Sequence, residues 1–244
     1  MKFASVVSKR ALVGSTLAAA SLAIASSTFT AAPAQAFSLN INPKYGSTEN
    51  TGATALLDFN FVDTVQGVLL QLGIKNTTNG SVGRGATSAT LVGVAFDLLT
   101  GVSAPQYGYN PGSSTFTKYY TNPSIPGLNN NKPFTVGIRS AGSGNFVGGN
   151  PTAGLTANQS TSVSFLLKGV TGTAAQVEQA FFEGFKNGTL KAAARFQQVE
   201  APGISGGSDK VMGEVVPEPT TIGGLLLGGS LLAKWLRRKQ QQKA

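Results

Sequence analysis

The chain has 244 residues and a formal net charge of +9, and it contains no cysteine and no histidine. This composition excludes disulfides, thiolate metal sites and the hydrolase triads that use a histidine base. The positive charge lies at the two ends, because residues 37–216 carry a net charge of only +2. A length of this size allows one ordinary domain between two targeting segments.

The N-terminus has the three parts of a secretory signal peptide. A basic stretch ends at Lys9 and Arg10, an apolar and small-residue run covers 11–25, and a polar stretch ends in small residues. Ala34 and Ala36 suit the small pockets of signal peptidase, so we expect cleavage between Ala36 and Phe37. The alternative, a permanent membrane helix, fits less well because the run is short and rich in alanine.

Residues 37–216 form the expected exported domain, and short runs within it alternate between apolar and polar side chains. Alternation with period two predicts half-buried strands. The runs are 55–61, 68–74, 92–98, 134–138 and 163–167, with turn-forming residues between them. We therefore predict a mainly β fold, an antiparallel β-sandwich or jelly-roll-like domain. The Gly/Ser/Asn-rich stretch 140–154 is the best candidate for a long mobile loop.

One helix interrupts the strands. Thr173 and Gln176 match a capping box, Val177, Phe181 and Phe185 recur at helical spacing, and Gly188 can end the helix in a left-handed conformation. We expect this helix to pack over an edge or open end of the sheet. Residues 190–199 read as the closing strand.

An aromatic cluster between 107 and 120 is the most suggestive surface feature. Exposed tyrosines can stack on sugar rings, which makes Tyr107, Tyr109 and Tyr119 candidate sugar-binding residues. The alternative is a hairpin whose aromatic side chains, including Phe116 and Tyr120, pack on their own sheet.

The acidic side chains offer few candidates for catalysis. A glycan hydrolase would need two facing carboxylates, drawn from seven candidates: Asp58, Asp63, Asp97, Glu178, Glu183, Glu200 and Asp209. Asp58 and Asp63 have an odd separation, which predicts opposite faces of one strand. We therefore expect no enzyme, cofactor or nucleic-acid partner.

Individual charged residues have structural as well as functional interpretations. Asp97 could bind calcium together with 129–131, or it could cap a turn at a strand end, which we favour; Asp209 has the same structural alternative. Arg84 and Arg139 are interpreted as solvated surface charges. No metal site is predicted.

The C-terminus contains Pro217, Glu218 and Pro219, then a mostly apolar stretch over 220–236, then a basic cluster of Arg237, Arg238 and Lys239. Seventeen helical residues rise about 25 Å, close to the thickness of a bilayer core. The positive flank should stay cytoplasmic, which would place the preceding domain outside.

This order of motifs in 217–244 resembles the PEP-CTERM sorting signal of Gram-negative bacteria, and 89–98 and 194–199 resemble segments of exported cyanobacterial members. The resemblance implies sorting by exosortase, a membrane enzyme, after passage through the inner membrane. It implies a cell-envelope, surface or extracellular location. The alternative is a plain tail anchor that is never processed.

The expected function is a non-catalytic structural or surface role. The alternatives are a carbohydrate-binding module for exopolysaccharide and a carboxylate-dependent glycan hydrolase. Extracellular polysaccharide is the partner that the first alternative requires.

Overall fold

The computed structural model describes residues 36–216. The predicted signal peptide and the predicted membrane span at 220–236 lie outside the described residues. Within 36–216, no helix is long and apolar enough to cross a membrane.

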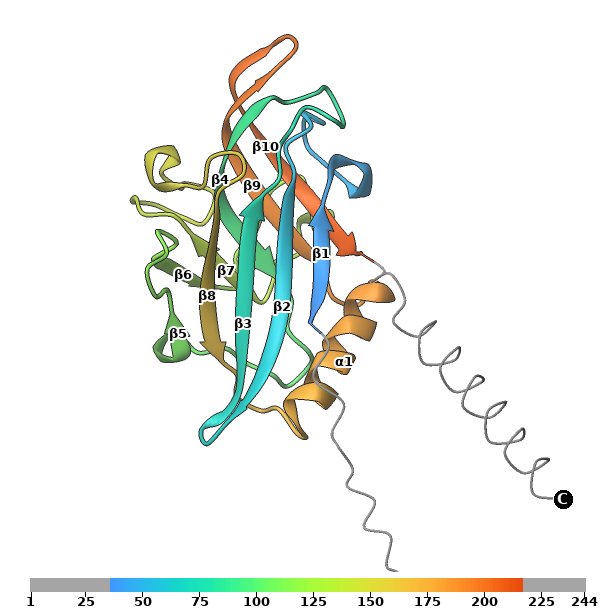
Figure 1. The fold of residues 1–244 in the computed structure, drawn as a ribbon, viewed down its shortest axis with the longest axis vertical. Helices are drawn as coiled ribbons and strands as arrows, with labels where there is room; N and C mark the ends of the chain where they lie inside the picture. Colours follow the sequence, from blue (N-terminus) through green and yellow to red (C-terminus); the bar gives the residue numbers. More distant parts are fainter. Residues whose placement is uncertain (1–35, 217–244) are drawn as a thin grey trace, which may run out of the picture. The chain divides into compact units, whose positions relative to one another are not determined.

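The described chain folds into one sheet of ten strands, and every pair of neighbours is antiparallel (Figure 1). The order across the sheet is β5-β8-β3-β2-β1-β10-β9-β4-β7-β6. The strands are β1 (Phe37–Ile41), β2 (Ala55–Thr64), β3 (Gly67–Asn76), β4 (Ser88–Phe96), β5 (Tyr109–Asn110), β6 (Lys118–Thr121), β7 (Val136–Arg139), β8 (Ser160–Leu166), β9 (Ala192–Ala201) and β10 (Ile204–Val215).

The helical elements are one α-helix and four single turns of 3-10 helix. They are α1 (Ala174–Lys186), η1 (Pro43–Tyr45), η2 (Gln106–Gly108), η3 (Asn129–Asn131) and η4 (Pro151–Ala153). The prediction of a mainly β, antiparallel domain with one helix is confirmed.

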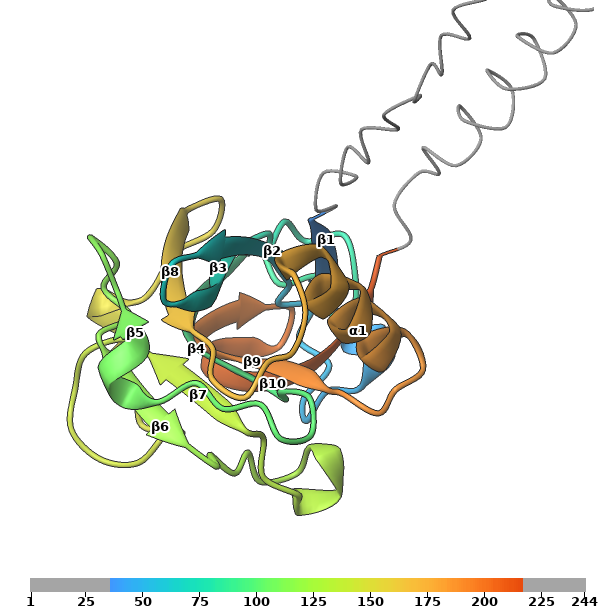
Figure 2. The same cartoon turned by 90° about the horizontal axis from the view of Figure 1, so that it is seen from below.

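The sheet curls on itself until it is nearly closed. In Figure 1 the strands β8, β3, β2 and β1 lie in front of β9, β4 and β7, and Figure 2 shows the same arrangement from below. Hydrogen bonding between β1 and β10 joins the two layers into one sheet. The fold is therefore a single rolled sheet, where the sequence predicted a sandwich or jelly roll.

The main core fills the interior of this rolled sheet. Alternate residues of β2 and β3 point inward, so that Leu57 pairs with Ile74 and Phe59 with Leu72. α1 covers the lower end of the sheet in Figure 1, beside β1 and β10. The ring of Phe181 lies 4.9 Å from that of Phe61, which extends the aromatic core onto the helix.

The helix begins and ends as the sequence predicted. The Thr173 side chain accepts a hydrogen bond from the Gln176 backbone, and the Gln176 side chain accepts one from the Thr173 backbone. Gly188 has a φ of 77° just after the last turn, and its backbone N–H donates to the Phe185 carbonyl. Gly188 therefore supplies the left-handed conformation that ends many helices.

The sequence did not predict β1 or β10, the first and last strands of the described chain, and the role predicted for 190–199 was wrong. The segment 190–199 does not close the sheet, because it continues into a hairpin of β9 and β10. β10 does not show the alternation of apolar and polar residues that predicts a strand, because Asp209 occupies one of its inward-facing positions. This fully buried carboxylate accepts hydrogen bonds from the Ser47 hydroxyl and the Thr51 backbone and hydroxyl, which ties down the loop after β1.

A second, smaller core lies on the outer face of β4, β7 and β9, under the two long segments 122–135 and 140–154. It contains Ile125, Leu128, Phe134 and Phe146. Gly137 in β7 makes room for it, because a Cβ there would approach the Phe146 ring to 2.8 Å. The stretch predicted as a mobile loop is thus packed against the sheet.

Candidate functional site

Two residues of the predicted cleavage site, Ala36 and Phe37, lie at the start of the described chain. Ala36 is exposed, whereas Phe37 opens β1 and stacks on Phe59 with ring centroids 5.1 Å apart. Ala34 and the predicted sorting residues lie outside the described residues, namely Pro217, Glu218, Pro219, Arg237, Arg238 and Lys239.

The two ends of the folded domain lie side by side. Leu39 in β1 pairs with Val215 in β10, and the Val216 backbone N–H donates to the Ser38 carbonyl at 2.9 Å. The chain therefore enters and leaves the domain through neighbouring antiparallel strands.

The predicted sugar-binding tyrosines divide into two kinds. Tyr109 in β5 and Tyr119 in β6 come from the two edges of the sheet, and their rings lie 5.6 Å apart. The Tyr109 hydroxyl donates to the Phe116 carbonyl and the Tyr119 hydroxyl donates to the Ala104 carbonyl. Burial raises the pKa of both hydroxyls, so they stay protonated as donors. These two residues pack against each other where the two edges of the sheet meet. They do not form the hairpin of the packing alternative, because β5 pairs with β8 and β6 pairs with β7.

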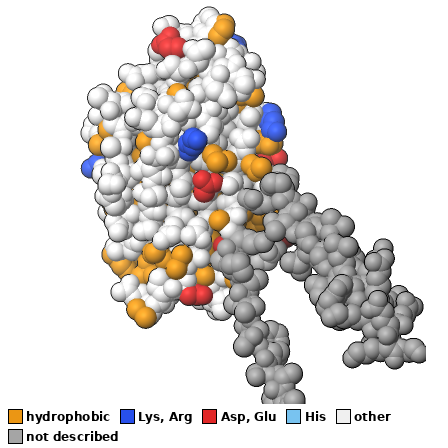
Figure 3. Space-filling view, in the orientation of Figure 1, with side chains coloured by type: hydrophobic (Ala, Val, Ile, Leu, Met, Phe, Trp, Pro, Cys, Tyr) orange, Lys and Arg blue, Asp and Glu red, His pale blue; other side chains and the backbone are white. Residues whose placement is uncertain are grey.

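Tyr107 is the tyrosine that faces solvent, with 81 % of its surface exposed. The other exposed large apolar side chains of the described chain are Val62 and Val65, near the turn between β2 and β3. Figure 3 shows apolar side chains gathered over this turn and over β5. Tyr107 lies in η2, directly before β5 in the chain.

Most of the carboxylates proposed for catalysis accept a hydrogen bond or form an ion pair with a structural partner, as Glu200 does with the Gly206 backbone N–H. Asp58 accepts from the Ser38 hydroxyl at 2.6 Å, and Asp63 accepts from the Ala174 backbone N–H at 2.8 Å. Glu183 forms an exposed ion pair with Lys186.

Asp97 confirms the structural interpretation of a cap at a strand end. It follows β4, and its two carboxylate oxygens accept backbone N–H groups from Thr135 at 3.2 Å and Lys191 at 2.9 Å. Burial raises the pKa of this carboxyl, and the two backbone hydrogen bonds act in the opposite direction. Within residues 36–216, no three acidic side chains come together as metal ligands.

Glu178 is a second carboxyl group whose pKa is raised by burial. It lies on α1 with 4 % of its surface exposed, and burial raises its pKa to about 7 against an opposing hydrogen bond from the Phe61 backbone. One of its oxygens, Oε2, is buried without a hydrogen-bond partner. A raised carboxyl pKa is typical of proton donors, but Glu178 does not line the cavity described next.

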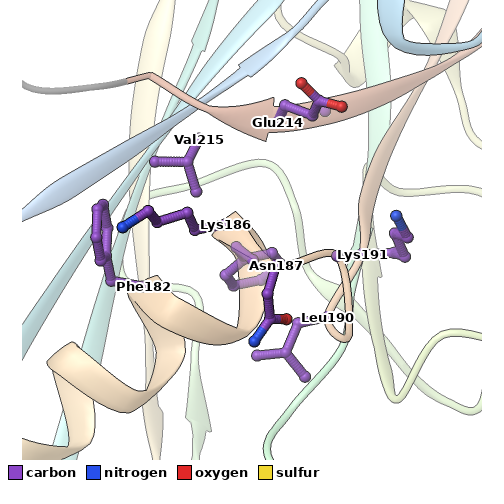
Figure 4. Close-up of a pocket in the computed structure, with 10 residues that line it drawn as sticks. Phe182, Lys186, Asn187, Leu190, Lys191, Glu214 and Val215 are labelled. Atoms are coloured by element: carbon purple, nitrogen blue, oxygen red, sulfur yellow. The ribbon is translucent and has the colours of Figure 1, made fainter.

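A cavity of about 380 Å³ lies between the C-terminal end of α1 and β10. Phe182, Leu190 and Val215 supply apolar surface, while Lys186, Asn187, Lys191 and Glu214 supply polar groups. Figure 4 shows the Glu214 carboxylate on the side of β10 away from the helix, and the Lys186 ammonium beside the Phe182 ring. With a single carboxylate in its lining, the cavity lacks the acid pair of a glycosidase.

Comparison of the chain with protein-family models, with curated proteins and with solved structures found no match.

Sequence reasoning missed two arginines on the outer face of the sheet. Arg139, predicted to be solvated, is 1 % exposed, and its guanidinium donates to the Tyr120 hydroxyl and to the carbonyls of Gly142, Ser143 and Gly144. Arg195 donates to the Gly148 carbonyl at 2.6 Å. Both arginines bind the loop that covers them, which no local pattern around either residue indicates.

Proposed function

We propose that the chain is an exported cell-envelope protein whose β domain has a non-catalytic structural or surface role and whose C-terminal signal directs its sorting. The observation that carries this proposal is the coincidence of boundaries. β1 begins at Phe37, directly after the expected signal-peptidase cut, and β10 ends at Val215, two residues before Pro217. Both targeting segments can therefore be removed without cutting into a strand.

The expected route combines three sequence features. The signal peptide directs export, the apolar span over 220–236 holds the chain in the inner membrane, and Arg237, Arg238 and Lys239 remain on the cytoplasmic side. Proline restricts its own backbone and that of the residue before it, so Pro217 and Pro219 favour an extended segment at the outer membrane boundary. An exosortase-type enzyme could bind such an extended segment in its active site.

The roles of the carboxylates support a non-catalytic domain. Asp58, Asp63, Asp97 and Asp209 accept hydrogen bonds that fix loops, strand ends or the helix N-terminus. Groups held this way contribute to stability, and the proposal assigns them no reaction.

The test follows a tagged full-length chain in a host that has exosortase and in one that lacks it. We expect the C-terminal peptide with Trp235 to be lost from the mature protein only in the first host. Glu218→Ala should leave membrane insertion intact and block processing, whereas replacing Arg237, Arg238 and Lys239 with Gln should weaken retention in the membrane. Full retention of the peptide in both hosts would replace this proposal with a plain tail anchor.

A carbohydrate-binding role remains the second candidate because Tyr107 is 81 % exposed. Stacking on a sugar ring needs a free aromatic face, which Tyr107 has and the packed residues Tyr109 and Tyr119 lack. Loss of retention on neutral polysaccharide in Tyr107→Ala would favour this role, and unchanged retention would oppose it.

A further inference from the structure

Four basic residues form one row across five adjacent strands. Lys118 in β6 pairs with Arg139 in β7, and Arg139 pairs with Gly93 in β4. Gly93 pairs on its other side with Arg195 in β9, which pairs with Lys210 in β10. Directly paired residues of antiparallel strands project from the same face of a sheet, with neighbouring strands about 4.8 Å apart. The row therefore places four positive charges side by side on the outer face.

Like charges placed directly opposite each other destabilise a sheet unless other groups compensate them. In the described part of the chain the only ion pair joins Lys186 to Glu183, away from this row. No carboxylate compensates the arginines. Their partners are carbonyl oxygens, a hydroxyl and, for Arg139, the Tyr120 ring, whose centroid lies 5.3 Å from the guanidinium. The row therefore carries an uncompensated positive charge.

Two of the guanidinium nitrogens have no partner at all. Arg139 Nη1 and Arg195 Nε are buried and make no hydrogen bond. Burial and the nearby charge of Arg139 lower the pKa of Arg195, which fits two cations held close together. An unpaired buried cation is costly, and an anion near Arg195 would relieve that cost.

Two residues of the row, Arg195 and Lys210, lie with Gln197 and Ser208 in a patch of four polar side chains on the β9–β10 hairpin. Arg195 pairs with Lys210, and Gln197 pairs with Ser208 two residues along. The first three are half-buried and Ser208 is exposed. Gln197 keeps its side-chain oxygen free of partners, while its amide nitrogen binds the Gly148 carbonyl. The patch, Arg195, Gln197, Ser208 and Lys210, thus holds two cations and the Ser208 hydroxyl as donors, while the Gln197 oxygen can only accept.

We propose that this patch binds an acidic polysaccharide through its carboxylate or sulfate groups. Planar guanidinium donors suit both oxyanions, and the ammonium of Lys210 adds a second charge at the next strand. The choice of a polysaccharide over a nucleic acid rests on the proposed export of the chain. It also fits the patch itself, which has no aromatic residue on which a base could stack.

The experiment measures binding of the purified full-length chain in detergent to polygalacturonate, to dextran sulfate and to neutral dextran. Lys210→Gln and Arg195→Gln should each weaken binding to the two polyanions about fivefold, and added salt should weaken it further. Polygalacturonate and dextran sulfate separate carboxylate from sulfate recognition. Neutral dextran should not bind at this patch.

Matched control variants distinguish binding at this patch from non-specific attraction of a polyanion to the net positive charge of the chain. Lys75→Gln and Arg84→Gln remove the same charges from exposed positions elsewhere, and the basic tail is common to every variant. Lys210→Arg keeps the charge and should retain binding even if the contact of Lys210 with the Pro126 carbonyl is altered. Near-ultraviolet circular dichroism checks that each variant is folded.

Equal weakening in the controls, or loss of binding in Lys210→Arg, would overturn the proposal. Tighter binding to a single-stranded oligonucleotide than to either polysaccharide would overturn it as well. Tail processing of Lys210→Gln, followed in the exosortase host, should be normal. A failure of sorting and a failure of polysaccharide binding can therefore be told apart.

Discussion

Glu178 shows how a single buried carboxyl group makes stability depend on pH. Its side chain lies in the interface between α1 and the sheet, where burial raises its pKa from 4.5 to about 7. Between these two values the folded protein holds a proton that the unfolded chain has lost. The contribution of this bound proton to the free energy of unfolding is fully present below about pH 4.5 and is lost as the pH rises through about 7.

We predict that Glu178→Gln removes this loss, because the amide is neutral at every pH. The variant should be more stable than wild type at pH 8, by on the order of 2 kcal/mol, and the difference should shrink towards pH 5. Urea unfolding at several pH values measures it. Glu183→Gln, which alters an exposed residue of the same helix, should show no such trend. An equal difference at pH 5 and pH 8 would contradict the assignment to Glu178.

Arg139 marks the limit of sequence reasoning at the scale of one residue. Its place at the end of a strand was predictable, since Val136 and Ile138 alternate with Gly137. Its burial was not, because the cover comes from the Gly-rich segment that follows, and carbonyl groups of that segment are its main partners. Any sequence can supply carbonyls, so no residue type signals such a contact.

At the scale of elements, α1 was the most predictable part of the fold. Its first residue, its apolar face and its last residue are all determined by nearby residues, because capping and helical spacing depend on local sequence. What the sequence did not indicate is a third contact at the helix start. Asp63, at the far end of β2, accepts a hydrogen bond from the backbone N–H of Ala174, the first residue of the helix.

Asp63 should therefore stabilise α1 through both this hydrogen bond and its charge near the positive end of the helix dipole. We predict that Asp63→Ala lowers the free energy of unfolding by about 1 kcal/mol. Glu183→Ala, which removes the same charge near the other end of the helix, should change it by less than about 0.5 kcal/mol. Equal losses in the two variants, measured by urea unfolding, would show that Asp63 does not cap the helix.

β10 was unpredictable for the opposite reason to α1. Its inward positions include Asp209 in place of an apolar residue, and it contains Gly206, Gly207 and Gly213. Asp209 is tolerated inside because the loop after β1 saturates it with donors from 158 or more residues away in the sequence. Because these donors are distant in the sequence, the hydrogen bonds that stabilise the buried carboxylate produce no periodic pattern around Asp209.

At the scale of the whole molecule, the sequence predicted the antiparallel strands but not how they join. A sandwich and a rolled sheet present the same alternation along each strand, so the pattern cannot separate them. The difference lies in which strands are neighbours. β1 is placed between β2 and β10, and the short edge strands β5 and β6 meet through Tyr109 and Tyr119.

The placement of β1 and β10 makes both strands necessary for folding, and neither end of the chain outside 37–216 is needed. Residues 37–216, produced without either end, should fold as a β-rich domain whose far-ultraviolet spectrum and unfolding midpoint are unchanged by EDTA. Phe37, Leu39 and Ile41 are buried in the core, and the strand that carries them is hydrogen-bonded on both sides. Residues 37–203, which lack β10, should fail to fold, because the edges of β1 and β9 would both be exposed and Asp209 would no longer hold the loop after β1. A spectrum dominated by helix, a midpoint lowered by the chelator, or cooperative unfolding of 37–203 would each contradict a domain built around this pairing.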